Sequence, residues 1–167
     1  FYTKKKTAGL KSNYEIAWDQ FILNPMPQPS EPKAEGDLTF THKGNSVQVS
    51  GEGYSVNIEN GRITSISIDG REKLKAPLEP YYFRALTDND IDSLNFVPQM
   101  IPLHPYYRWR SASHSAKAVK TEVKAGEDNC VEVHIAWSTP LLKNSVTTYK
   151  IYPDMRIYVY HSAVPMA

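Results

Sequence analysis

The feature that most constrains the fold is a series of short β-branched and aromatic runs separated by turn residues. Residues 46–50 and 54–58 alternate apolar and polar positions around Gly51 and Gly53. Asn60-Gly61 then predicts a tight hairpin into residues 62–68, and Asp69-Gly70 predicts a second turn directly after that strand. The first half of the chain therefore predicts a meander of antiparallel strands.

The same pattern returns in the second half of the chain. Strands are predicted over residues 117–124, 131–137, 145–152 and 155–161, with turn residues at 126–129, 138–140 and 153–154. Val131, Val133 and Ile135 share one face of their strand, as do Ile157 and Val159 of theirs. No segment has a convincing apolar period of about 3.6 residues. The expected fold class is all-β, an antiparallel β-sandwich.

A proline-rich segment predicts the main boundary of the chain. Four of the twelve prolines fall within NPMPQPSEPKAEG, where they remove backbone donors that helices and sheets need. We therefore expect a linker over residues 25–36, between a segment of residues 1–24 and a domain of residues 37–167. Before the linker, residues 14–23 predict a strand. Between residues 76 and 110 the strand pattern gives way to a loop rich in proline and tyrosine.

Composition excludes several classes of partner. The 167 residues carry a net charge of +1, which provides no field to attract nucleic acid or an anionic membrane. No apolar run approaches the roughly 20 residues of a membrane-spanning helix. The single cysteine, Cys130, cannot form an internal disulfide. We expect a soluble chain whose compartment, cytoplasmic or periplasmic, the sequence does not decide.

The densest polar cluster, residues 84–92, follows an aromatic stretch. Asp88, Asp90 and Asp92 match the first, third and fifth positions of a calcium loop. However, Ser93 replaces the required glycine and Gln99 the bidentate glutamate, so no metal site is expected. The five histidines have no ligand spacing and no cofactor motif is present, so no cofactor is expected in this chain.

Three further expectations concern the side chains of this region. Arg84 should bond a carboxylate or a carbonyl within its own loop. Neighbouring carboxylates in one short loop rarely face each other across a sugar ring, so no catalytic residue is assigned. Aromatic rings suit the apolar face of a pyranose and could form a sugar-stacking platform or simply pack. The rings concerned are Tyr81, Tyr82, Tyr106, Tyr107 and Trp109.

Residues 77–92, PLEPYYFRALTDNDID, resemble the motif that opens the last domain of the glycoside hydrolase family two β-galactosidases. That motif has an aromatic residue, then Arg-Ala-Pro, then Asp-Asn-Asp, and here Leu86 stands in place of the proline. Residues 14–21 resemble the closing strand of the preceding immunoglobulin-like domain, and residues 148–151 resemble a strand further along the last domain.

The resemblance implies a galactose mutarotase-like supersandwich, the small-chain domain, of which residues 37–167 would form the N-terminal half. It also implies that the catalytic glutamates lie in a separate TIM barrel and that this chain is non-catalytic scaffold. The partners would then be the remaining domains of a β-galactosidase and a galactoside, with a second copy of the chain as a further possibility. The residues expected near substrate are Arg84, Asp88, Asn89, Asp90, Tyr106, Tyr107 and Trp109.

Two alternatives stay open at this point. The aromatic residues would make the chain a free-standing carbohydrate-binding module if it binds sugar alone. An aldose mutarotase-like enzyme would share the fold but needs a glutamate base and a histidine acid facing each other across a cleft. Glu122 and His134 lie on candidate strands, but no motif supports them as that pair.

Overall fold

The computed structural model describes residues 1–23, 34–85, 87 and 105–166. The chain divides into two compact units, Phe1–Pro32 and Lys33–Ala167. In the first unit Tyr2 and Glu15 form an isolated antiparallel bridge, supported by a 2.8 Å hydrogen bond from the Tyr2 hydroxyl to the Glu15 carboxylate. The first unit is thus a loop closed by local contacts.

The strand predicted over residues 14–23 is wrong. Glu15 pairs with Tyr2, and the Ile16 amide donates to the Phe1 carbonyl, but no ladder continues toward Leu23. A strand needs a partner along its length, and among the described residues none forms a ladder with residues 18–23. Trp18 remains 77% exposed. The assignment of this segment to an immunoglobulin-like domain stays a prediction.

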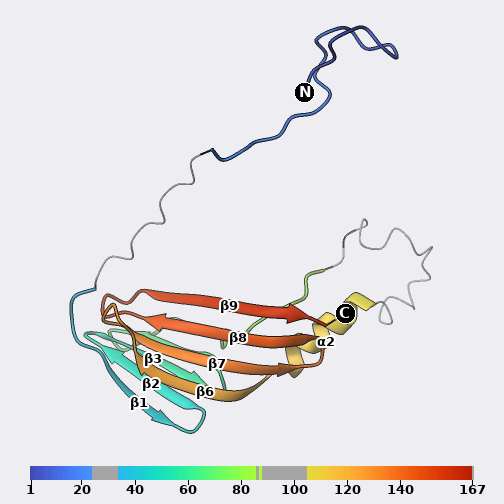
Figure 1. Cartoon of the computed structure of the whole chain (residues 1–167). Coiled ribbons are helices and arrows are strands. Elements are labelled where there is room, and N and C mark those ends of the chain that lie inside the picture. The colour runs from blue at the N-terminus through green and yellow to red at the C-terminus, as the bar shows by residue number, and fades with distance from the viewer. Residues whose placement is uncertain (24–33, 86, 88–104, 167) are drawn as a thin grey trace. The chain divides into compact units, whose positions relative to one another are not determined.

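The second unit is an antiparallel β-sandwich, which confirms the expected fold class (Figure 1). One sheet has the order β1-β2-β3-β4-β5, and its strands are β1 (Thr39–Lys43), β2 (Ser46–Gly51), β3 (Tyr54–Glu59), β4 (Arg62–Ile68) and β5 (Arg71–Glu72). The other has the order β6-β7-β8-β9, and its strands are β6 (Lys117–Ala125), β7 (Val131–Thr139), β8 (Leu142–Ile151) and β9 (Ile157–Pro165). All pairings are antiparallel between neighbours in sequence, as a meander predicts.

The predicted tight turns are confirmed. Asn60 and Gly61 have φ of 48° and 81°, and Asp69 and Gly70 have φ of 50° and 72°. Two consecutive residues with positive φ give the turn whose twist matches a hairpin, and Asn-Gly and Asp-Gly adopt it at low cost. The sequence did not predict β1. All of its residues are exposed, so the strand lacks the alternation of buried and exposed residues that marks a half-buried strand.

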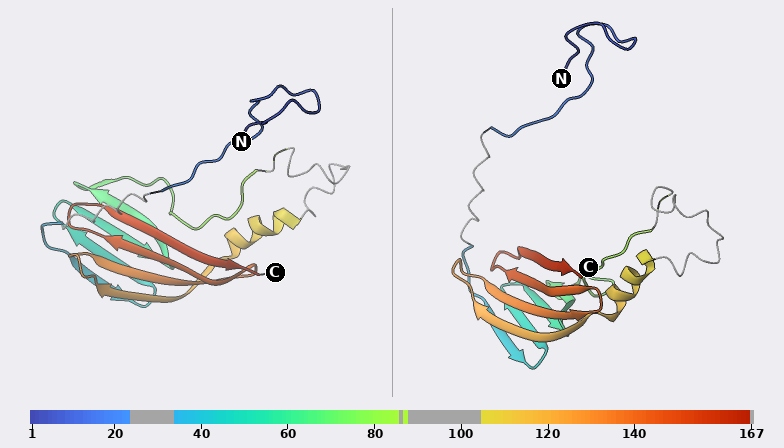
Figure 2. Two further views of the ribbon diagram at one scale, coloured as in Figure 1. Left: turned by 45° about the horizontal axis from the view of Figure 1, so that its top comes forward. Right: turned by 45° about the vertical axis from the view of Figure 1, so that its right-hand side comes forward.

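A helix, α2 (Pro105–Ser115), replaces the end of the loop predicted over residues 76–110. Among its described side chains, those of residues 107–115, the buried ones are the small Ala112 and Ser113, and they form no apolar stripe that would reveal a helical period. Proline is well suited to a first helical turn, where no backbone donor is needed. Both views in Figure 2 place α2 at one end of the sandwich.

The core lies between the two sheets. It is built from the inward faces of β2, β3 and β4 on one side and of β7 and β8 on the other. Ile58 and Ile63 of the first sheet and Ile135 of the second are 0% exposed. Burial of this kind stabilises by about 25 cal/mol per Å² of apolar surface. The Tyr149 hydroxyl donates across the layers to the Gly61 carbonyl at 2.9 Å, and burial raises the pKa of Tyr149 to about 12.

The Asn60-Gly61 turn approaches the second sheet closely. A Cβ at Gly61 would lie 2.6 Å from Ile135 Cγ2 and 2.8 Å from Trp137 Cη2. At the equivalent position of the next turn, Gly70, nothing lies within 4 Å. Gly61 is therefore required for both its positive φ and its lack of a side chain, whereas Gly70 is required for its φ alone.

This difference gives a matched pair of variants. Both Gly61→Ala and Gly70→Ala place a side chain at positive φ, but only Gly61→Ala also overpacks the core. We expect Gly61→Ala to lower the free energy of unfolding by about 1 to 3 kcal/mol more than Gly70→Ala. Urea unfolding of the two variants measures the difference. Equal losses would show that the turn does not press on the second sheet.

Candidate functional site

The candidate site is a hollow of about 310 Å³ at the edge of the core. Its walls are mostly apolar with a few convergent polar groups, which is the usual composition of small-molecule sites. The segment of residues 78–83, here called the strap, forms one side of it, and β8 and β9 form the other. The lining residues are Leu78, Glu79, Pro80, Tyr81, Tyr82, Thr147, Tyr149, Val159 and His161.

The first half of the strap is fastened to β4. The Leu78 amide donates to the Ile63 carbonyl at 2.9 Å. Glu79 accepts a 2.7 Å charge-assisted hydrogen bond from Arg62 Nε. These contacts fix the strap where it leaves the first sheet.

Arg62 is itself held by the second layer. Its Nη2 donates to the Ala116 carbonyl at 3.1 Å, and its guanidinium carbon stands 5.5 Å from the centre of the Trp137 ring. A guanidinium over an indole face is a favourable cation–π arrangement. The position of Glu79 therefore depends on Trp137 through Arg62.

The second half of the strap is fastened through Tyr82. Its amide donates to Ser113 Oγ of α2 at 2.8 Å, and Ser113 Oγ in turn donates to the Trp109 carbonyl at 3.0 Å. The Tyr82 hydroxyl lies 3.2 Å from His161 Nε2 of β9 and 3.3 Å from Ser145 Oγ of β8. One residue thus joins the strap to a helix and two strands.

His161 connects Tyr82 to the core. Its Nδ1 lies 2.8 Å from Thr147 Oγ1, which accepts a 2.8 Å hydrogen bond from Trp137 Nε1. His161 is exposed as a residue, but its partial burial lowers its pKa, because burial disfavours the charged imidazolium. The sequence did not single out this network, because its members are as far as 79 residues apart and have no spacing signal.

Some of the predicted site residues lie where the strap ends. Arg84 Nη1 donates to the Ala85 carbonyl at 3.0 Å, which confirms a carbonyl partner within its own loop. Tyr107 packs its ring 5.4 Å from that of Phe83, while Trp109 is half-buried on the same helix. Tyr81 contacts His114 edge to face at 6.1 Å.

The other predicted residues cannot be placed in the site. Asp88, Asn89 and Asp90 lie outside the described residues, and so does Asp92. The side chain of Tyr106 is likewise outside them, although its backbone belongs to α2. Their nearness to substrate, and the aromatic platform as a whole, stay predictions.

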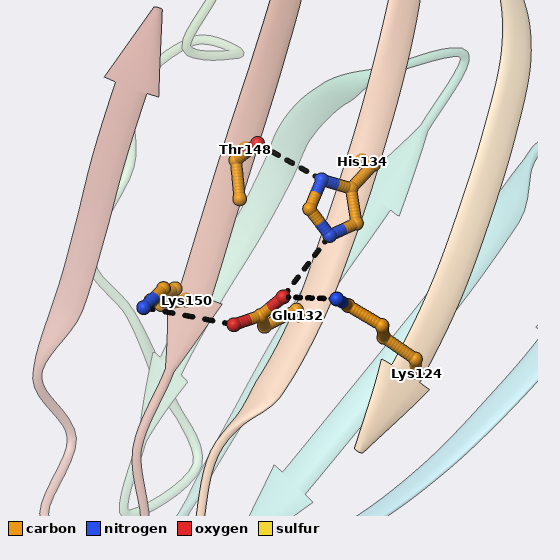
Figure 3. Close-up of polar contacts among 5 residues, drawn as sticks. All are labelled: Lys124, Glu132, His134, Thr148 and Lys150. Carbon is orange, nitrogen blue, oxygen red and sulfur yellow. Dashed lines mark hydrogen bonds and ion pairs between the residues drawn. The ribbon is translucent and has the colours of Figure 1, made fainter. Parts of the chain in front are cut away.

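A second polar cluster lies on the outer face of the β6–β9 sheet (Figure 3). Glu132, whose side chain is 13% exposed, accepts from Lys124 at 3.0 Å and lies 3.1 Å from His134 Nε2 and 3.6 Å from Lys150. His134 Nδ1 also contacts Thr148 Oγ1 at 3.0 Å. Burial alone would raise the pKa of Glu132, but the hydrogen bonds and charges of its partners outweigh it, so that this pKa lies below its ordinary value.

The pair Glu122 and His134 does not have the geometry of a mutarotase. The two residues are direct partners on the adjacent strands β6 and β7, on one face of one sheet, and not across a cleft. Glu122 forms a 2.7 Å ion pair with Lys120, and the carboxylate that contacts His134 is that of Glu132. Glu132 and His134 are two residues apart on a predicted strand and therefore share a face. This spacing is a signal in the sequence from which their contact could have been predicted.

In the described parts of the chain, no three histidine, cysteine, aspartate or glutamate side chains gather as a metal site would require. The helix within these parts is neither long nor apolar enough to cross a membrane.

Two stacked antiparallel sheets, crossed at one end by a strap and a short helix, define the second unit as a β-sandwich domain with a small apolar hollow. The chain belongs to the β-galactosidase small chain family, whose sequence model matches residues 48–166.

Individual relatives agree with this assignment. A β-galactosidase of Priestia megaterium is 28% identical over 166 residues, 96% of this chain and 15% of that protein. A β-galactosidase of Klebsiella pneumoniae is 28% identical over 65% of this chain, and one of Halalkalibacterium halodurans is 28% identical over 72% of it. The chain spans 11% of the length of each of these two proteins.

The Glu132 cluster generates a pH-dependent prediction. At pH 7 we expect Glu132→Gln to lower the free energy of unfolding by about 1 to 3 kcal/mol, because charge-assisted bonds are lost. The pKa of Glu132 is lowered in the folded state, so this stabilisation is complete above the ordinary carboxyl range and disappears as pH falls through the lowered value.

The control is Glu122→Gln on the neighbouring strand, where the carboxylate side chain is 60% exposed and its ion pair should contribute little. Urea unfolding at several pH values compares the two variants. Identical stability profiles would mean that the Glu132 cluster is an ordinary surface ion pair.

Proposed function

We propose that this chain is a non-catalytic β-sandwich part of a larger β-galactosidase, which hydrolyses terminal β-D-galactosides, and that it supports and borders the active site of that enzyme. The observation that carries the proposal is the match of residues 48–166 to the β-galactosidase small chain family. The resemblance of residues 77–92 to the opening motif of that domain supports it from the sequence.

The lack of a suitable carboxyl pair supports the non-catalytic part of the proposal. Glycoside hydrolysis needs two carboxyl groups about 5 to 10 Å apart on either side of the scissile bond. Among the described residues, Glu79 is the one carboxylate that lines the hollow, and it is engaged by Arg62. Acid and nucleophile would therefore come from another part of the larger enzyme.

The course of the strap supports the bordering role. The strap runs past the hollow and leads at Arg84 into the Asp88-Asn89-Asp90 motif. Contacts to β4, β8, β9 and α2 hold it on several sides. A scaffold that fixes the entry to a loop in this way is suited to presenting that loop to a neighbouring domain and to a bound galactoside.

We expect the chain alone to show no turnover of a chromogenic galactoside and to bind galactose with a Kd no lower than about 1 mM. The comparison is a variant in which Asp88, Asp90 and Asp92 are all changed to asparagine. Turnover that survives rigorous purification and is lost in this variant would contradict the proposal and make the loop a catalytic site.

The bordering role is tested in a chimera that carries this chain in place of the matching segment of the Priestia megaterium β-galactosidase. We expect Arg84→Ala to lower kcat/KM by about tenfold, as for a lost charge-assisted hydrogen bond. Arg71→Ala, on the two-residue strand β5, is the control and should leave kcat/KM unchanged. Equal kcat/KM values for both variants would show that Arg84 does not lie near the substrate.

A further inference from the structure

The hydrogen bonds between Trp137 and Tyr82 can be ordered by direction. Trp137 Nε1 can only donate, so Thr147 Oγ1 accepts from it at 2.8 Å. The hydroxyl hydrogen of Thr147 is then left for His161 Nδ1, 2.8 Å away. In this arrangement, which gives the Thr147 hydrogen an acceptor, Nδ1 carries no proton and the proton of neutral His161 lies on Nε2.

This tautomer fits the contacts on the other side of the ring. His161 Nε2 faces the Tyr82 hydroxyl at 3.2 Å and donates to it. The Tyr82 hydroxyl then donates to Ser145 Oγ at 3.3 Å. Every donor from Trp137 to Tyr82 has an acceptor in this one direction, and the chain of bonds passes through the strap at Tyr82 and ends on Ser145 of β8.

We propose that neutral His161 is the positioning residue of the second half of the strap: the directional chain Trp137–Thr147–His161–Tyr82 fastens the Tyr82 side chain to the core, and protonation of His161 releases it. His161 acts through Tyr82 and is not assigned a catalytic role.

Protonation disturbs the chain at Thr147. Both ring nitrogens of an imidazolium donate, so Thr147 Oγ1 would receive hydrogen bonds from His161 and from Trp137, and its own hydrogen would lose its acceptor. The charge would also stand beside the mostly apolar hollow, which penalises it. Rotation of His161 toward solvent relieves both costs and leaves Tyr82 without this partner.

Four other residues with polar side chains line the same hollow as His161: Glu79 and Tyr82 on the strap, and Thr147 and Tyr149 on β8. Glu79 is paired with Arg62, and burial raises the pKa of Tyr149 to about 12. The pKa of His161 is lowered in the folded state, so the fastening is complete above the ordinary histidine value of about 6.5 and is lost as pH falls below it.

The test uses the full chain and two readouts. Nitrogen-15 NMR of the imidazole reports the tautomer of His161 at pH 7.5. Amide hydrogen exchange of the strap, divided by the intrinsic exchange rate, reports its opening at pH 7.5 and at pH 5. The variants are Tyr82→Phe, which keeps the ring and removes the hydroxyl, and Tyr81→Phe, the control on the exposed neighbouring tyrosine.

We expect the Nε2–H tautomer and, in Tyr82→Phe at pH 7.5, strap exchange about three- to tenfold faster than in Tyr81→Phe, as for one lost hydrogen bond. Acidification should speed strap opening in the unmodified chain and in Tyr81→Phe but not in Tyr82→Phe. A proton on Nδ1 at pH 7.5 would overturn the proposal. An acid response of equal size in Tyr82→Phe would overturn it as well. Such a response would show that acid opens the strap without the hydrogen bond between Tyr82 and His161.

Discussion

The close packing of the Asn60-Gly61 turn against Trp137 is the contact on which the rest of the structure depends. Because Gly61 has no side chain, the first sheet can approach the indole of Trp137 closely. The Tyr149 hydroxyl, from the second sheet, donates to the carbonyl of the same glycine. Close packing of this kind tolerates little added volume, because protein interiors have few voids. The sequence therefore fixes the spacing of the two layers at this point through one glycine and one tryptophan.

Both ends of the strap are tied to this contact. On one side Arg62 lies over the Trp137 ring and holds Glu79, and on the other Trp137 donates to Thr147, which leads through His161 to Tyr82. The hollow between the strap and β8 and β9 is thus shaped by the core and not by the strap alone. In a larger β-galactosidase, as proposed, this arrangement would transmit the rigidity of the sandwich to the loop that begins at Arg84.

The sequence predicted the parts of the fold that depend on local chemistry. Asn60-Gly61 and Asp69-Gly70 predicted their turns because few residue pairs adopt two positive φ values at low cost, and Val131, Val133 and Ile135 predicted the buried face of β7 by alternation. Helix α2 was missed because it buries small residues such as Ala112, and the strand over residues 14–23 was wrong because strand-forming residues still need a partner.

The site was predicted less completely. The motif that ends at Asp92 located the strap and the Arg84 loop, but not the contacts that hold the strap. The register of β8 and β9 pairs His161 with Thr147, and the course of the strap brings Tyr82 to His161. A contact between residues 79 positions apart is a product of tertiary structure and leaves no spacing to detect. Trp137 belongs to no motif in the sequence, and its polar roles emerge only from its neighbours.

The two sheets form a single cooperative core around Trp137, and the strap depends on that core. Native-state hydrogen exchange in increasing denaturant measures this cooperativity residue by residue. We expect amides of β3 and β4 and amides of β7 and β8 to converge on one opening free energy, with the Leu78 amide joining them or opening earlier. Separate opening free energies for the two sheets, or a Leu78 amide that stays protected after β4 has opened, would contradict it.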